Sequence, residues 1–441
     1  MSHVTAALCG SLRYLIILAA PTLAAQTVQP QADNLPGEVQ LSMFQMQASK
    51  VNLVSMGLQA STDFDDNAMN RSQGQRGNLL TLIQPDLGWH FTRARFDWQT
   101  DYAPSFSRST NVSTYDSVAH RLNSELQLKL TKRLRLRAHE SFLRSTNPFD
   151  QLRISESAAG SFVHNVPSDA VPATPADVRT EQASMEIAYA VGPHSTAGVG
   201  GDFFAARYSL LPGAQLPNQV LQNSASAGGH SYLSRQLTRH QWTGLEYRVQ
   251  KSIFRSSNTW SLVHSVFFNH TIAISRPFTL SFFAGPERSV TGMTGASAPL
   301  APVTSGRPSM WRWSSGVAGR WTGIDTSLTA RYSRRISNDV VLGTVQLSKI
   351  SAEMRRQFRT QWTTRVLASY DDNKALAAPG SLTYASAAGA LARLLSPNLS
   401  LEFQYWRVHL SSRGPLPGAL LSDYNRISIS LNYDYKYPLG R

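Results

Sequence analysis

Cysteine is almost absent from this chain, which has one residue, Cys9, among 441. Cys9 precedes a short apolar run near the N-terminus, and Leu8 stands directly before it, which is a poor match to a lipoprotein signal. If the leader is removed, the rest of the protein contains no cysteine. A secreted protein of this size without disulfides is not a small disulfide-stapled domain.

Long hydrophobic runs are absent as well. After the leader no stretch reaches the roughly 18 consecutive apolar residues that a transmembrane helix needs. If the protein lies in a membrane, it must therefore cross as strands. The composition agrees, with 42% hydrophobic and 10% aromatic residues, because an alternating barrel needs apolar side chains at only half of its strand positions.

Motifs of enzymatic chemistry are missing. There is no HExxH, P-loop, CxxC or GxSxG, and the histidines show no ligand spacing, so neither a metal nor a cofactor is expected and the protein is not predicted to be an enzyme. A lipid-facing hydrolase centred on His264 with Ser265, or on His270, is conceivable, but lone histidines near strand ends are more often interfacial. The chain also has no basic helix, so its formal net charge of +14 does not indicate nucleic-acid binding.

The N-terminus resembles a secretory signal peptide. One cation, Arg13, precedes an apolar run, and small residues precede Gln26. The run is far shorter than the roughly 20 residues that span a bilayer, which disfavours the alternative of a membrane anchor. We predict a cleaved signal peptide at residues 1–25 and a polar, Gln-rich periplasmic tail at 26–49, which either contacts a partner or is only a lead-in.

From about residue 50 onward, apolar and polar residues alternate in runs of ten to fifteen. The segment 120–144 shows this best: Leu122, Leu126, Leu128 and Leu130 interleave with polar residues, and a tight turn at 131–133 leads into a second alternating run. Period 2 places every leucine on one face of a strand and every charge on the other. The alternation alone fits a soluble sandwich as well as a barrel, and the export signal favours the barrel.

Connections between the candidate strands are alternately short and long. This pattern is typical of outer-membrane barrels, with short periplasmic turns and long external loops. We predict that residues 50–441 form one all-β, transmembrane, antiparallel up-and-down barrel of 16–18 strands, the first (51–62) and tenth (258–272) being the least defined. The longest connection, 146–179, either folds inward and constricts the lumen or stays outside and binds or shields.

The last strand carries aromatic residues on one face. Tyr433, Tyr435 and Tyr437 alternate with polar residues, and the run resembles the closing strand of bacterial outer-membrane barrels, which the barrel-assembly machinery reads. The chain departs from that pattern by continuing beyond the last tyrosine to Arg441. Tryptophans fit the same interfacial belts: Trp89, Trp98, Trp242, Trp311, Trp313, Trp321 and Trp362.

The face opposite the apolar residues is predicted to line a lumen that is mixed in charge but basic. Rings of inward cations concentrate anions and disfavour cations, so the pattern indicates an anion-preferring pore. The alternative is that opposed charges on neighbouring strands neutralise each other in a filled barrel. The predicted inward cations are Arg95, Arg121, Lys129, Arg135, Arg137, Arg248, Arg312, Arg320, Arg331, Arg365 and Arg426, and the inward acids are Asp97, Asp101, Glu125, Glu246, Asp325, Glu402 and Asp434.

An aromatic-Asp-Asp-Asn sequence occurs twice, with the acidic pairs Asp65 and Asp66 in one copy and Asp371 and Asp372 in the other. Their oxygens suit a divalent cation at the rim, bridging lipopolysaccharide phosphates, but Asp and Asn are also the residues that start turns, and the turn is favoured. The four residues weakly resemble strand ends of barrels associated with bacterial exopolysaccharide loci.

The predicted function is an outer-membrane channel of a Gram-negative-type bacterium for hydrophilic, preferentially anionic solutes or acidic polysaccharide, and the chain resembles a porin. The alternative is a non-transport barrel, either a surface-polysaccharide scaffold or adhesion protein or a membrane hydrolase. Expected partners are outer-membrane lipid and lipopolysaccharide, the assembly machinery, and periplasmic polysaccharide-export components.

Overall fold

The computed structural model describes the strands and most of the short connections. The predicted signal peptide, the tail at 26–49 and residues 147–175 of the longest connection lie outside the described residues, so the position predicted for that loop stays a prediction. The described ranges are 52–67, 77–111, 116–146, 176–210, 223–255, 257–293, 309–339, 342–376, 380–413 and 422–439.

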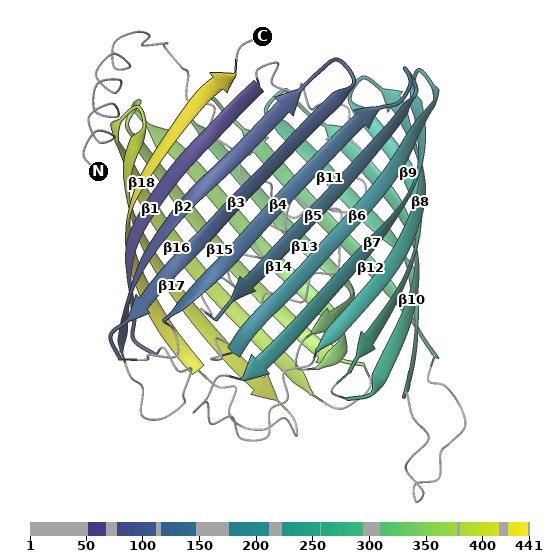
Figure 1. The fold of residues 1–441 in the computed structure, drawn as a ribbon. Helices are drawn as coiled ribbons and strands as arrows, with labels where there is room; N and C mark the ends of the chain where they lie inside the picture. The colour runs from purple at the N-terminus through teal and green to yellow at the C-terminus, as the bar shows by residue number, and fades with distance from the viewer. Residues whose placement is uncertain are drawn as a thin grey trace, which may run out of the picture.

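Eighteen antiparallel strands form one closed sheet (Figure 1). The strands follow one another around the barrel in chain order, and each pairs with the strands before and after it. They are β1 (Asn52–Asp65), β2 (Asn78–Thr92), β3 (Phe96–Ser109), β4 (Ser117–Lys129), β5 (Leu134–Ser145), β6 (Ala176–Gly192), β7 (Ser195–Leu210), β8 (Ser224–Thr238), β9 (Gln241–Phe254), β10 (Thr259–Ala273), β11 (Phe278–Met293), β12 (Ser309–Thr322), β13 (Thr326–Asp339), β14 (Gly343–Phe358), β15 (Trp362–Ala375), β16 (Ser381–Ser396), β17 (Leu399–Arg413) and β18 (Ser422–Leu439).

Closure is made by β1, which pairs with β2 on one side and with β18 on the other. The β1–β18 register runs from Asn52 opposite Leu439 to Asp65 opposite Arg426. The predicted all-β, up-and-down barrel is confirmed, with both of the least defined strands present and the count at eighteen. Closure pairs β1 with β18, so neither terminal strand is left as a sheet edge facing lipid.

The barrel has two distinct ends. The turn end carries the start of β1, the end of β18 and the short connections after even strands, and the loop end carries the connections after odd strands. At the loop end, β13 and β14 are joined through only residues 340–342. β14 begins at Gly343, whose φ of 75° is easy for glycine and costly for other residues. Asn338 and Asp339 continue β13.

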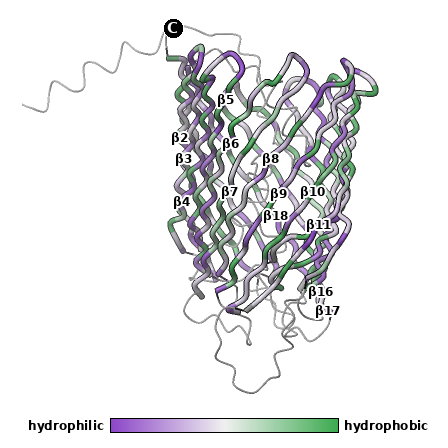
Figure 2. The backbone as a smooth tube through the Cα atoms, turned by 90° about the vertical axis from the view of Figure 1, so that its right-hand side faces the viewer, coloured by the Kyte–Doolittle hydropathy of each residue, from purple (hydrophilic) through white to green (hydrophobic). Residues whose placement is uncertain are grey.

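The exterior is apolar and aromatic, as a lipid-facing wall requires. Trp311 and Trp313 are 67% and 63% exposed, and the predicted row of Tyr433, Tyr435 and Tyr437 lies exposed near the turn end of β18. Figure 2 shows the corresponding alternation of apolar and polar residues along each strand. Trp242 differs from the predicted belt, because its register places it on the lumen side with Glu246. Within the described ranges no helix is long and apolar enough to cross a membrane.

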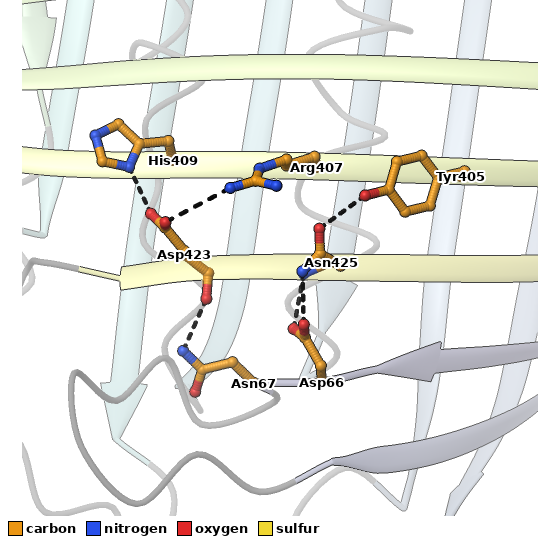
Figure 3. Close-up of polar contacts among 7 residues, drawn as sticks. All are labelled: Asp66, Asn67, Tyr405, Arg407, His409, Asp423 and Asn425. Atoms are coloured by element: carbon orange, nitrogen blue, oxygen red, sulfur yellow. Dashed lines mark hydrogen bonds and ion pairs between the residues drawn. The ribbon is translucent and has the colours of Figure 1, made fainter.

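The β18–β1 junction is held on both faces near the loop end. On the lumen side, Arg426 and Asp63 form a buried ion pair, with Nη2 and Oδ2 at 2.5 Å. On the outer side, the Asn425 backbone N–H and side-chain amide both donate to Asp66 at 2.7 Å (Figure 3). The Tyr405 hydroxyl donates to Asn425 at 2.8 Å, which ties β17 to the same junction.

We expect Arg426→Gln to destabilise the closed barrel, because Asp63 is 1% exposed and would keep a buried charge without its cation. Losing one partner of a buried pair costs about 3–5 kcal/mol. Urea unfolding of the refolded barrel measures the change. The control is Arg407→Gln, whose exposed pair with Asp423 is 4.0 Å long and should contribute less than about 1 kcal/mol. Equal losses in the two variants would contradict the assignment.

Candidate functional site: the lumen

The lumen face follows from the register, because residues that alternate with the exposed apolar side chains must point inward. Arg121 lies opposite Leu143, Glu125 opposite His139 and Lys129 opposite Arg135, so these positions of β4 and β5 share the inner face. The same parity continues around the closed sheet. It defines one inward row on every strand.

Charge and apolarity divide this inner face into two halves. In the turn half, inward positions are mostly polar: Asp97, Asp101, Glu125, Lys129, Arg135, Arg320, Arg331, Glu353, Arg365 and Glu402. In the loop half, inward positions include buried apolar residues: Leu80, Leu82, Leu143, Val178, Phe204, Phe254, Phe283, Val345, Leu347, Leu382, Tyr384, Val408, Leu410 and Tyr424. The expectation of a lumen that is polar along its whole length is therefore wrong for the loop half.

A sequence signal for this apolar lining was available. In the runs at 79–83, 203–206 and 282–283, apolar residues occupy both parities of the strand instead of one. Continuous apolar runs are typical of strands that are covered on both faces.

The end of the β13–β14 hairpin lies inside the barrel. The β12–β13 ladder stops at Ser315 opposite Arg334, although β13 and β14 remain paired as far as Asp339 opposite Gly343. Gln346 lies opposite Ile336, past the end of the β12–β13 ladder. Its parity is that of a lipid-facing position, but it is only 5% exposed. We call residues 335–347 the inward hairpin.

Contacts to β12 show on which side of the wall the inward hairpin lies. Arg312 is on the lumen face of β12, since it alternates with the exposed Trp311 and Trp313. Its Nη1 donates to Oε1 of Gln346 at 3.0 Å. The face of the hairpin that carries Gln346 therefore packs against the lumen side of β12.

Glu287 of β11 anchors the inward hairpin to the wall. Its carboxylate accepts hydrogen bonds from the Ile336 backbone N–H at 2.8 Å and from the Ser265 hydroxyl at 2.9 Å, and the Ser314 hydroxyl donates to it as well. Because the β12–β13 ladder has ended, this carboxylate supplies the acceptor that a strand would otherwise provide. A small cavity remains beside it, lined by Arg248, Gln250, Val263, Ser265, Phe267, Phe283, Glu287, Arg335 and Ile336.

The tip of the inward hairpin reaches an apolar cluster on a different part of the wall. Leu342 packs against a cluster formed by Leu382 and Tyr384 of β16, Trp406, Val408 and Leu410 of β17, and Tyr424 of β18. By register all six cluster residues face the lumen. The hairpin thus spans part of the barrel interior in the loop half.

Buried polar contacts link strands on the inner face of the wall. Arg137 Nη2 lies 2.6 Å from Glu125 Oε1, and Arg137 is opposite Glu186 in the register. The Tyr232 hydroxyl donates to Glu186 at 2.6 Å, and His230 Nε2 is 3.5 Å from the same carboxylate. These contacts neutralise charge inside the wall and leave little of it for a passing ion.

The predicted lumen cations therefore have different surroundings. Four form ion pairs with acids: Arg137, Arg248 with Glu246, Arg365 with Glu353, and Arg426. Arg312 binds the inward hairpin, and Arg121, Arg135 and Arg331 face the lumen with partners of their own. Lys129 and Arg320 are exposed near the turn end, and among the described residues neither makes an ion pair. Arg95 differs from the prediction, because it lies in the turn between β2 and β3.

The two predicted acidic pairs adopt the same geometry on β1 and β15. Asp65 and Asp371 point inward and are buried, whereas Asp66 and Asp372 have the opposite parity. The Asn67 backbone N–H donates to Asp65 at 2.8 Å, as in an Asx turn. Because the carboxylates of each pair point to opposite faces, they do not converge on one ion. No group of three or more metal-ligating side chains occurs in the described part of the chain.

The histidines considered for a hydrolase do not assemble with a serine. His264 and His270 face outward on β10, and Ser265 faces inward, where it binds Glu287. His264 Nδ1 is instead 2.8 Å from the Tyr247 hydroxyl. This geometry offers no nucleophile beside a base on one face.

Comparisons with known proteins find barrels of related architecture. No protein-family model and no curated protein matches the chain. Similar solved structures include Pseudomonas aeruginosa OpdQ (11% identity, 87% of this chain and 99% of that chain, TM-score 0.45), Acinetobacter baumannii OccAB4 (11%, 89% and 99%, 0.46) and Pseudomonas aeruginosa OpdK with vanillate (10%, 88% and 99%, 0.43). This is a likeness of barrel architecture alone.

We expect Glu287→Ala to loosen the inward hairpin, since the Ile336 N–H would lose its acceptor. A buried unsatisfied donor costs about 1–3 kcal/mol, which is roughly 5- to 150-fold in an opening equilibrium. Hydrogen exchange at Ile336 and its neighbours measures the change. Ser289→Ala, two residues further along the same face of β11, is the matched control and should leave exchange unchanged. Unaltered protection in Glu287→Ala would contradict the anchoring role.

Proposed function

We propose that this protein is an outer-membrane channel whose passage is restricted by the inward hairpin. The observation that carries this proposal is that Gln346, on the hairpin's outward-parity face, hydrogen-bonds to Arg312 on the inner face of β12. An eighteen-stranded barrel is wide enough to enclose an aqueous channel. A segment of the wall folded into it narrows that channel on one side of the membrane.

The proposed orientation places the turn end in the periplasm and the loop end outside the cell. The short connections after even strands support it, because outer-membrane barrels have short periplasmic turns. The predicted export signal at 1–25 is part of the same proposal. Delivery of the chain to the outer membrane by the barrel-assembly machinery is also part of the proposal.

The proposed solutes are small, hydrophilic and preferentially anionic. Lys129 and Arg320 face inward near the turn end, and each is exposed. Cations at a channel mouth raise the local concentration of anions. An acidic polysaccharide would need a continuous polar track, and the apolar, buried loop half favours small solutes instead. Export partners for a polysaccharide therefore form no part of the proposal.

Planar-bilayer recordings of the refolded chain 26–441 test the restriction. We expect low single-channel conductance from the unaltered protein and a several-fold increase in Glu287→Ala/Leu342→Ala, because two of the three attachments of the inward hairpin are weakened and only the Arg312–Gln346 hydrogen bond remains. The Ser289→Ala variant should match the unaltered protein. Equal conductance in all three would contradict the restriction. If none of the three folded barrels conducts ions, the result would contradict transport and favour a non-transport surface barrel.

Reversal potentials under a salt gradient test the ion preference. We expect anion preference in the unaltered protein and a shift toward cations in Lys129→Gln/Arg320→Gln, because both substitutions remove positive charge from the turn-end mouth. Arg407→Gln is the control, since it removes a cation from the lipid-facing side. Anion preference that survives the double substitution would refute the role of these two residues.

A further inference from the structure

A collar of basic residues surrounds the exterior near the loop end. Each odd strand from β3 to β17 carries at least one exposed cation there, at a position of lipid-facing parity. The collar consists of Arg108, Arg144, Arg207, Lys251, Arg288, Arg334, Lys374 and Arg407. Because the side chains face away from the lumen, they play no part in attracting solutes to the channel.

Acidic neighbours divide the collar into two sectors. Arg144 is 3.2 Å from Asp177, Lys374 is 3.1 Å from Asp372, and Arg407 is 4.0 Å from Asp423. Figure 3 shows Asp423 between Arg407 and His409. In this sector, acids of the protein itself offset three of the four cations, and Arg108 makes no ion pair with the described residues.

The other sector runs from β7 to β13, and none of its own strands carries such an acid. On the adjoining β6, the outward acids Asp177 and Glu181 border Arg207 but are paired with Arg144 and Arg179. We call Arg207, Lys251, Arg288 and Arg334 the acid-free arc. Among the described residues of β7 to β13, every Asp and Glu within a strand has lumen-facing parity. β7 to β11 lie side by side in Figure 2, so most of the arc belongs to one continuous part of the wall.

Aromatic side chains place the arc at a membrane interface. The Arg288 guanidinium lies 5.8 Å from the ring centroid of Trp311, which is opposite it in the register. Trp313 lies on the same face of β12, and both rings are highly exposed because β13 leaves the wall beyond Ser315. Tryptophan rings prefer the headgroup level of a bilayer.

We propose that the acid-free arc binds the phosphate groups of a phosphorylated lipid in the leaflet at the loop end. Under the proposed orientation this leaflet is the outer one, whose lipopolysaccharide bears such phosphates. Uncompensated cations beside apolar and aromatic side chains match a ligand that combines anionic headgroups with acyl chains. The predicted lipopolysaccharide contact is thereby assigned to β7–β13, in place of the acidic rim pairs.

Binding of bisphosphorylated lipid A to the refolded full-length barrel, measured by native mass spectrometry, tests the proposal. The arc variant is Arg207→Gln/Lys251→Gln/Arg288→Gln/Arg334→Gln. The matched control removes four cations that are each ion-paired with an acid: Arg144→Gln/Arg179→Gln/Lys374→Gln/Arg407→Gln. We expect the arc variant to bind at least tenfold more weakly and the control to bind within about threefold of the unaltered protein, since charges already paired offer less to a ligand.

Dephosphorylated lipid A and inorganic pyrophosphate distinguish the sources of binding and need no variant. Weak binding of both to the unaltered protein supports recognition of a lipid headgroup. Equal binding of the dephosphorylated lipid would overturn the proposal in favour of acyl-chain contacts, and tight pyrophosphate binding would overturn it in favour of a soluble-phosphate site. Equal losses in the two variants would overturn the assignment to the arc. None of these readouts depends on conductance, so the channel proposal can fail independently.

Discussion

The requirement that every backbone N–H and C=O in a lipid-facing wall finds a partner governs this structure. Seventeen consecutive strand pairings and the β1–β18 closure meet it around the barrel. The β12–β13 ladder is the place where a wall pairing ends early. There the carboxylate of Glu287 accepts the Ile336 N–H from two strands away. A single acid thus permits the hairpin end to leave the wall.

The inward hairpin accounts for the apolar lining of the lumen at β16 to β18. A hairpin end that folds inside must bury both of its faces, and a polar, solvated lumen wall would give it nothing to pack against. The Leu382 and Tyr384 cluster meets its tip at Leu342, and Arg312 meets its other face through Gln346.

The basic charge of the chain serves different purposes at different depths and faces. In the buried middle, Arg137 is held by Glu125 of the neighbouring strand β4, and Arg248 by Glu246 of its own strand β9. At the turn end, Lys129 remains exposed on the lumen face. On the outer face, the cations of the acid-free arc form the proposed phosphate site. The formal net charge of +14 alone therefore says little about ion selectivity, which depends on where each cation lies.

The sequence by itself determined the barrel, the strand order, the eighteen candidate strands and the aromatic exterior. Period-2 alternation and short turns are local features, and in a meander each turn brings the next strand into register. Only the tertiary structure decided the inward hairpin and the partners of the lumen cations. The Glu287 to Ile336 contact joins residues 49 apart across β12, and Arg426 meets Asp63 through closure of the barrel, 363 residues away. Such pairings depend on how the whole wall curves, which local alternation does not encode.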